Sequence, residues 1–350
     1  MEIKYIFQAK STCKIFLAGV ALCLSGIGIQ AQTQDSVAVI EDGWIKKMDD
    51  NIAMDISLNN AKEIFEVRSP NQNIIIHPNA DINLRYSLNY KFISLGFQMA
   101  PDFIPGNGDE DSKGDTKSFS LGTTLILKHS FFELSYVKVK GFYLDNTDDF
   151  MARLPGDPYI QFPDLRYKAF SISSGYYNNS RFSFKSLTSQ TERQLKSAGS
   201  FIPMFNLRYY IVDDQSSISD TQKSNNWEAS IGPGYAYTFV AQEKFYASVG
   251  AQANLGYLNT KLTTRQPTGD VISNQDNFLF RWDGKVGVGY NGNTFYTGLY
   301  TTLSGTQYKQ EGTTVRNFDT RVYHHLFLGI RIKAPDYLKR KVSQFEQRFL

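Results

Sequence analysis

Apolar and polar residues alternate along most of this chain, and this period of two constrains the fold more than any other feature. In residues 244–257 every second side chain is apolar, from Phe245 to Tyr257, and mostly Ser, Gly, Gln and Asn stand between them. Strict alternation over such a length predicts a long β-strand with two unlike faces. Strands of soluble proteins are usually shorter, whereas a strand that crosses a membrane needs about 9–11 residues.

The alternation recurs along the chain and predicts about twelve strands. They are expected at 80–90, 92–100, 116–127, 131–142, 165–177, 181–189, 202–212, 226–238, 244–257, 277–290, 293–303 and 321–332. The aromatic and aliphatic face suits lipid, and the small, polar and charged face suits a watery lumen. The sequence therefore predicts an all-β fold, a transmembrane antiparallel β-barrel of about 12 strands, with 10 or 14 as alternatives. A secreted soluble β-protein is the other class that this pattern allows.

The N-terminal residues have the features of a secretory signal peptide. Three lysines precede an apolar run at 15–29, and the small residue Ala31 follows it. Removal of residues 1–31 would take away both cysteines, Cys13 and Cys23, and would lower the net charge from +3 to +1. A nearly neutral chain without thiols does not suggest a nucleic-acid binder or a cysteine metal site. No second apolar run is long enough for a spanning helix, which excludes a helical inner-membrane protein.

The rest of the chain divides into three parts. Residues 32–79 form an N-terminal periplasmic or first-strand segment with a strand expected at 51–59, and residues 80–332 form the barrel. Residues 333–350 are expected to form a short amphipathic helix. Short and long connections alternate between the strands, as in outer-membrane barrels. This alternation fails at 190–201 and 213–225, which are adjacent and both long.

Several charged residues fall on the polar face of the expected strands. We expect them to line the lumen, where they either set ion selectivity or hold a narrow barrel rigid through ion pairs. These lumen-lining candidates are Arg85, Lys185, Arg208, Glu228, Arg281, Asp283 and Lys285.

The sequence gives little support for catalysis or metal binding. His324 and His325 are neighbours on an expected strand, so their side chains point to opposite faces and cannot share one metal ion. No serine-centred motif of a hydrolase is present. We therefore expect no catalytic residue, no metal, no cofactor and no enzyme activity.

Five stretches resemble an uncharacterised family of outer-membrane β-barrel proteins from Gram-negative bacteria, known as domain of unknown function 4421. They are NYKFISLGF (89–97), VKGFYLDNT (139–147), FPDLRY (162–167), SQTERQLKSAGSF (189–201) and GPGYAYTFV (232–240). The resemblance implies a barrel in the outer membrane and implies no activity. The fourth stretch is the most distinctive, and it lies where the turn alternation fails. Its charged and amide residues are expected to form a lumen network, to contact a partner or to lie in a solvated loop: Glu192, Arg193, Gln194 and Lys196.

Three functions share this pattern of strands. The first is a narrow pore or uptake channel for small solutes, and the second is a non-conducting structural or interaction barrel of the cell envelope. The third is a barrel enzyme that modifies lipids. The expected partners are outer-membrane lipid and the barrel-assembly machinery, with small solutes as cargo of a pore, no nucleic acid, and a monomeric state.

Overall fold

The computed structural model describes residues 40–41, 43–68, 73–217, 220–309 and 316–349. All of them belong to one compact unit, residues 37–350. The expected signal peptide, residues 1–31, lies outside the described residues.

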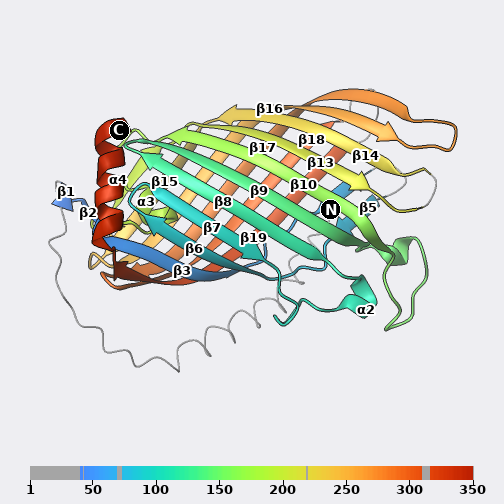
Figure 1. The fold of residues 1–350 in the computed structure, drawn as a ribbon. Helices are drawn as coiled ribbons and strands as arrows, with labels where there is room; N and C mark the ends of the chain where they lie inside the picture. The colour runs from blue at the N-terminus through green and yellow to red at the C-terminus, as the bar shows by residue number, and fades with distance from the viewer. Residues whose placement is uncertain (1–39, 42, 69–72, 218–219, 310–315, 350) are drawn as a thin grey trace. The chain divides into compact units, whose positions relative to one another are not determined.

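Twelve strands form one closed antiparallel ring (Figure 1). Each strand pairs with the next in chain order, and the last pairs with the first, from His325 opposite Asn59 to Lys333 opposite Asn51. The prediction of a twelve-stranded antiparallel transmembrane barrel is confirmed. The ring strands are β3 (Asn51–Asn59), β6 (Asn83–Tyr90), β7 (Ile93–Met99), β8 (Lys117–Leu127), β9 (Ser130–Leu144), β10 (Gln161–Tyr176), β13 (Met204–Asp214), β14 (Gln222–Gly232), β16 (Phe245–Thr264), β17 (Val271–Asn291), β18 (Phe295–Lys309) and β19 (Arg316–Lys333).

Two of these strands continue past a proline. β12 (Ala198–Phe201) precedes β13, and β15 (Gly234–Ala241) follows β14. The register is the same on both sides of the interruption, with Met204 opposite Gly232 and Phe201 opposite Tyr235. Proline has no N–H to donate to a ladder, so it interrupts the pairing locally without shifting it.

The two ends of the barrel differ. We call the end where β3 begins and β19 finishes the terminus end, and the opposite one the far end. Most turns at the terminus end are short, such as those between β6 and β7 and between β17 and β18. The far end carries the longer loops, with the short helices α2 (Glu110–Lys113) and η1 (Thr147–Asp149).

A C-terminal helix, α4 (Asp336–Phe349), follows β19 and lies across the terminus end (Figure 1). Phe345 stacks on Phe92 at 5.8 Å between ring centroids, and Lys91 Nζ lies 2.6 Å from a carboxylate oxygen of Glu346. The expected C-terminal helix is thus present and packs on the barrel. None of the helices in the described ranges is long and apolar enough to cross a membrane.

The strand expected at 181–189 is not formed, and that prediction is wrong. These residues contain the short helix α3 (Lys185–Thr188) and leave the ring, and β3 takes the twelfth place. The expected number of twelve still agrees with the structure, because the two differences cancel. The predicted strand at 181–189 is absent from the ring, and the strand expected at 51–59, which was not among the twelve, is present as β3.

The two faces of the wall differ as the alternation requires. Outward side chains are large, apolar and exposed, among them Ile231 (64 %), Leu255 (70 %) and Phe278 (85 %). Tyr296 and Tyr300 are buried inside, and each lies against an inward glycine of a neighbouring strand, Gly329 and Gly287. The tyrosine rings fill the space that these glycines leave.

This packing gives a matched pair of substitutions. A Cβ at Gly329 would lie 2.1 Å from Cζ of Tyr296, whereas a Cβ at Gly284 would meet only a backbone oxygen at 4.0 Å. We expect Gly329→Ala to lower the free energy of unfolding by about 1–3 kcal/mol, because the ring must move in a packed interior. Gly284→Ala should leave it unchanged within about 0.5 kcal/mol. Urea unfolding of the refolded barrel in vesicles measures both, and equal losses would contradict this packing.

Candidate functional site

The residues between β10 and β12 fold into the barrel instead of making a short turn. We call residues 177–197 the inner segment. It contains α3 and β11 (Glu192–Gln194), and β11 pairs with β2 (Ile45–Lys47), which in turn pairs with β1 (Ile40–Glu41). The segment begins with an Asn turn, in which the Asn179 side chain accepts from the Arg181 N–H at 3.0 Å and donates to the Gly199 carbonyl at 2.7 Å.

Polar side chains of the inner segment bond mainly to one another. Ser183 Oγ donates to a carboxylate oxygen of Glu192 at 2.7 Å, and Lys185 Nζ lies 3.3 Å from the other oxygen. Gln194 accepts from the Ser183 N–H at 2.7 Å and donates to the Arg181 carbonyl at 2.7 Å. Glu192, Arg193 and Gln194 are all less than one-tenth exposed, so this stretch is not a solvated loop.

Two arginines tie the segment to the wall on the side of β16 to β19. Arg193 donates to the Glu243 carbonyl at 2.8 Å and to Asn293, and burial lowers the pKa of its guanidinium. Arg331 on β19 donates to the Gln190 carbonyl through Nε at 3.0 Å and through Nη2 at 2.6 Å. Breaking the hydrogen bonds of a buried guanidinium costs free energy, because each lost bond leaves a desolvated donor or acceptor without a partner.

Aromatic packing ties the segment to the opposite wall. Phe184 stacks on Phe131 of β9 with ring centroids 4.2 Å apart, and Phe182 lies in a buried cluster with Ile126 and Tyr177. The inner segment is therefore held from β8 and β9 on one side and from β17 to β19 on the other.

Two cavities lie in the lumen beyond the inner segment. The middle cavity, about 330 Å³, has Leu187, Thr188 and Gln190 of the inner segment in its lining, together with Arg85 and Lys285. The far cavity, about 450 Å³, is lined by Asp283, Arg281 and other residues of the far half of the wall. Asp283 and Lys285 are successive inward positions on β17, so the two cavities adjoin along the barrel axis.

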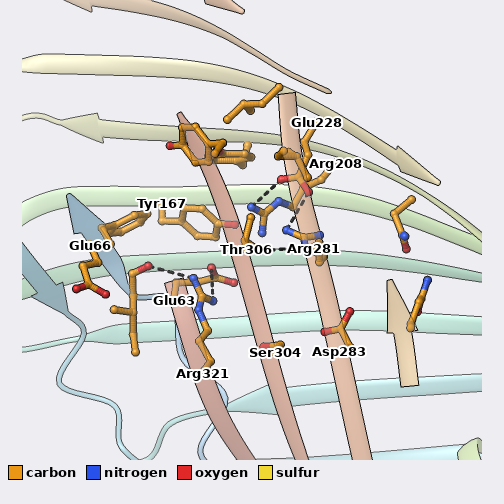
Figure 2. A pocket seen from close by; sticks show the side chains of 18 of the residues that line it. Glu63, Glu66, Tyr167, Arg208, Glu228, Arg281, Asp283, Ser304, Thr306 and Arg321 are labelled. Carbon is orange, nitrogen blue, oxygen red and sulfur yellow. Dashed lines mark hydrogen bonds and ion pairs between the residues drawn. The ribbon is translucent and has the colours of Figure 1, made fainter. Parts of the chain in front are cut away.

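A carboxylate between two arginines dominates the far cavity (Figure 2). Glu228 on β14 is 3 % exposed and lies 3.1 Å from Arg208 of β13 and 2.8 Å from Arg281 of β17. Arg281 also donates to Thr306 of β18 at 3.2 Å. These bonds join four strands on one side of the wall, β13, β14, β17 and β18.

A hairpin of two short strands, β4 (Phe65–Arg68) and β5 (Asn73–His77), covers part of the far end. β4 meets β19, and β5 meets β9. Phe65 packs against Phe142 and Tyr167 with ring centroids 5.5 and 5.7 Å apart, and Arg321 donates to the Ile64 carbonyl at 3.1 Å. We call this hairpin the far-end cap.

His77 is the last residue of β5 in the far-end cap, and its surroundings favour the neutral imidazole. Its Nδ1 lies 3.6 Å from an Asp145 carboxylate oxygen. Burial lowers the pKa of His77 to about 4 and Lys62 acts in the same direction, while Asp145 and Asp81 oppose them.

The structure distributes the sequence-predicted residues over three places. Arg208, Glu228, Arg281 and Asp283 line the far cavity, and Arg85 and Lys285 line the middle cavity. Lys185 was expected on a wall strand, which is wrong, because it lies on α3 and pairs with Glu192. Lys196 lies over the Trp44 ring at 5.4 Å.

Sequence reasoning missed other residues of these sites. Glu133 and His325 line the middle cavity, and the sequence singled out neither as a lumen residue. The alternation at 131–142 puts Glu133 on the face of Ser135, which was the available signal. Nothing in the sequence singles out Arg331 as the anchor of Gln190. Within the described ranges, no three His, Cys, Asp or Glu side chains gather as a metal site.

The Glu228 carboxylate gives a second matched pair. Glu228→Gln leaves two half-buried guanidiniums facing each other without their shared anion, so we expect the free energy of unfolding to fall by about 3 kcal/mol. Asp283→Asn changes a carboxylate in the same cavity that makes no ion pair with the described residues, and we expect a loss below about 1 kcal/mol. Urea titration followed by gel mobility distinguishes them, and similar losses would show that the arginines do not depend on Glu228.

The far-end cap should respond to acid. His77 has an ordinary pKa of 6.5 when undocked and about 4 when docked, so only the undocked form binds a proton between these values. Docking is fully stable above pH 6.5 and should weaken up to about tenfold per pH unit as the pH falls toward 4. Limited proteolysis within 60–80 should be faster at pH 5 than at pH 7. His77→Gln should abolish this difference and His129→Gln, at the terminus end, should keep it; equal cleavage of the unmodified chain at both pH values would refute the role of His77.

Comparison with solved structures finds outer-membrane barrels at low similarity. The chain is similar to the outer membrane protease OmpT of Escherichia coli (10 % identity, TM-score 0.32, 81 % of this chain and 95 % of that one). It is also similar to the beta domain of the Bordetella autotransporter BrkA (10 % identity, TM-score 0.37, 81 % of this chain and 99 % of that one). A third similar structure is LpxR of Salmonella typhimurium (10 % identity, TM-score 0.35, 79 % of this chain and 99 % of that one). No curated protein matches.

These neighbours correct one prediction. We expected no enzyme activity, and as an exclusion this is wrong, because the similar barrels include an outer membrane protease. A barrel can therefore carry catalysis, and the exclusion does not stand.

The sequence itself also matches a family model. The match runs over residues 35–330, which includes the inner segment and all ring strands except the last three residues of β19. The chain belongs to the family described as Domain of unknown function (DUF4421).

Proposed function

We propose that this chain is an outer-membrane barrel that its own inner segment closes to ions and solutes, and that it acts in the cell envelope by binding. The open pore, the first of the three sequence-based hypotheses, would need an unobstructed lumen. Arg85 and Lys285 do line lumen space, but that space lies beyond the inner segment.

The observation that carries this proposal is the separation of two spaces by the inner segment. Thr188 and Gln190 line the middle cavity, while Arg181 and Glu192 line a different pocket at the terminus end. The anchors of Arg193 and Arg331 join the segment to strands far from α3 in the sequence. Opening a path would therefore require several buried hydrogen bonds to break together.

The proposal places the terminus end toward the periplasm, after export by the expected signal peptide. Short turns at one end and long loops at the other support this orientation, since outer-membrane barrels have short periplasmic turns. The exposed apolar outer face supports insertion into lipid.

Single-channel recording in planar bilayers tests the closure. Folded wild-type barrel, verified by heat-modifiable gel migration, should give no conductance steps. A variant with residues 181–196 replaced by Gly-Ser-Gly should conduct, because the replacement removes α3 and β11 and keeps Asn179, whose side chain bonds to β12.

The matched control is the same replacement in a far-end loop, at residues 265–270, which should stay silent. Regular conductance steps from the folded wild type would overturn the proposal. A folded but silent variant would show that something other than the inner segment closes the lumen.

A further inference from the structure

A third cavity, the largest of the three at about 960 Å³, lies at the terminus end on the other side of the inner segment. We call it the mouth pocket. Five parts of the chain build it: β2 with Trp44 before it, the turn between β6 and β7, the end of β8 with the turn after it, the inner segment, and α4. Its lining includes Trp44, Lys128, Tyr177, Arg181, Phe182 and Glu346.

Positive charge exceeds negative charge in and around the mouth pocket. Lys47, Lys128, Arg181 and Lys185 line it, against two carboxylates, Glu192 and Glu346. Both carboxylates already have a lysine partner, Lys185 at 3.3 Å for Glu192 and Lys91 at 2.6 Å for Glu346. Asp49 and Lys196 stand beside the pocket and add one charge of each sign.

The excess charge is concentrated on residues without a carboxylate partner. Among the described residues, Lys128, Arg181 and Lys196 have no carboxylate within 4.0 Å. Arg181 and Lys196 instead lie over the Trp44 ring, at 5.0 and 5.4 Å from its centroid. A cation–π contact positions a cation and leaves its charge uncompensated. The ring thus holds two like charges together at the pocket, an arrangement that an anion would relieve.

We propose that the mouth pocket binds an acidic peptide segment of a partner protein on the side of the terminus end. Its size exceeds that of a small inorganic anion, and its cations come from separate parts of the chain, so one anionic group could not reach them all. An extended peptide with several carboxylates could contact Lys128 and Arg181 at once. The proposal rests on the closed lumen, since the inner segment supplies Arg181 and Phe182.

Trp44 supplies the readout for a binding experiment. In a Trp227→Phe, Trp282→Phe background, Trp44 is the one tryptophan left, since the chain has three. The folded barrel is titrated with hexaglutamate, hexaglutamine and inorganic phosphate at low salt. Hexaglutamate should give a saturable change in Trp44 emission that weakens with added salt. Hexaglutamine and phosphate should bind at least tenfold more weakly.

Variants then locate the site. Lys128→Gln with Arg181→Gln should weaken hexaglutamate binding by about tenfold or more, as for paired charges at an interface. The control, Lys117→Gln with Lys223→Gln, removes two far-end cations and should change binding less than twofold. Heat-modifiable migration verifies that every variant is folded.

Three results would overturn the proposal: equal binding of hexaglutamine, equal binding of phosphate, or unchanged affinity in the Lys128, Arg181 variant. A fourth concerns the chain's own acidic residues before β2. If Asp35→Asn, Glu41→Gln and Asp42→Asn together raise the hexaglutamate affinity tenfold, the pocket serves its own chain and not a partner. Conductance of the same samples tests the closed lumen separately, so a failure of one proposal is distinguishable from a failure of the other.

Discussion

A backbone N–H or C=O in the hydrocarbon core of a membrane has no water to bond, so every strand of this chain needs a partner on both sides. The pairing of β19 with β3 meets that requirement, because it leaves none of the twelve ring strands with a free edge. The outer apolar face, the polar lumen and the long strands all follow from the closed ring. The choice of small residues opposite tyrosines, such as Gly329 beside Tyr296, follows from the limited space inside it.

Closing the ring also creates an interior whose polar groups need partners, and the inner segment supplies some of them. A ring of this size has a polar interior that must be filled, hydrated or paired. In the far half, Glu228 between Arg208 and Arg281 does the pairing, and at the terminus end the inner segment fills the space. The inner segment can remain inside because its polar groups meet partners on the wall. Gln190 illustrates this, since its carbonyl accepts twice from Arg331 and its side chain accepts from Asn291 at 2.9 Å.

The sequence predicts the strands of the barrel wall but not the inner segment that lies inside them. Alternation of apolar and polar residues indicates a segment whose successive side chains face two different media, here lipid and the lumen. Ring strands such as β16 and β17 meet this condition. The alternation misled at 181–189, where Phe182 and Phe184 alternate with polar residues although they pack inside on Ile126 and Phe131. The failure of the turn alternation near 190–201 was a correct sign that the chain leaves the wall there. The partners of Arg193 and Arg331 lie far away in sequence, and no local pattern reveals contacts of that kind.

The position of Arg331 has a consequence for the order of assembly. It lies on β19, the last ring strand in the chain, and it holds Gln190, which is made much earlier. Contacts between such distant residues form late, because a long loop must close before they can gain anything. The pairing that completes the ring and the bonds from Arg331 to the inner segment therefore form with the same strand. A nascent barrel that lacks β19 has neither a sealed wall nor the Arg331 bonds to Gln190, so the C-terminal strand completes both in one step.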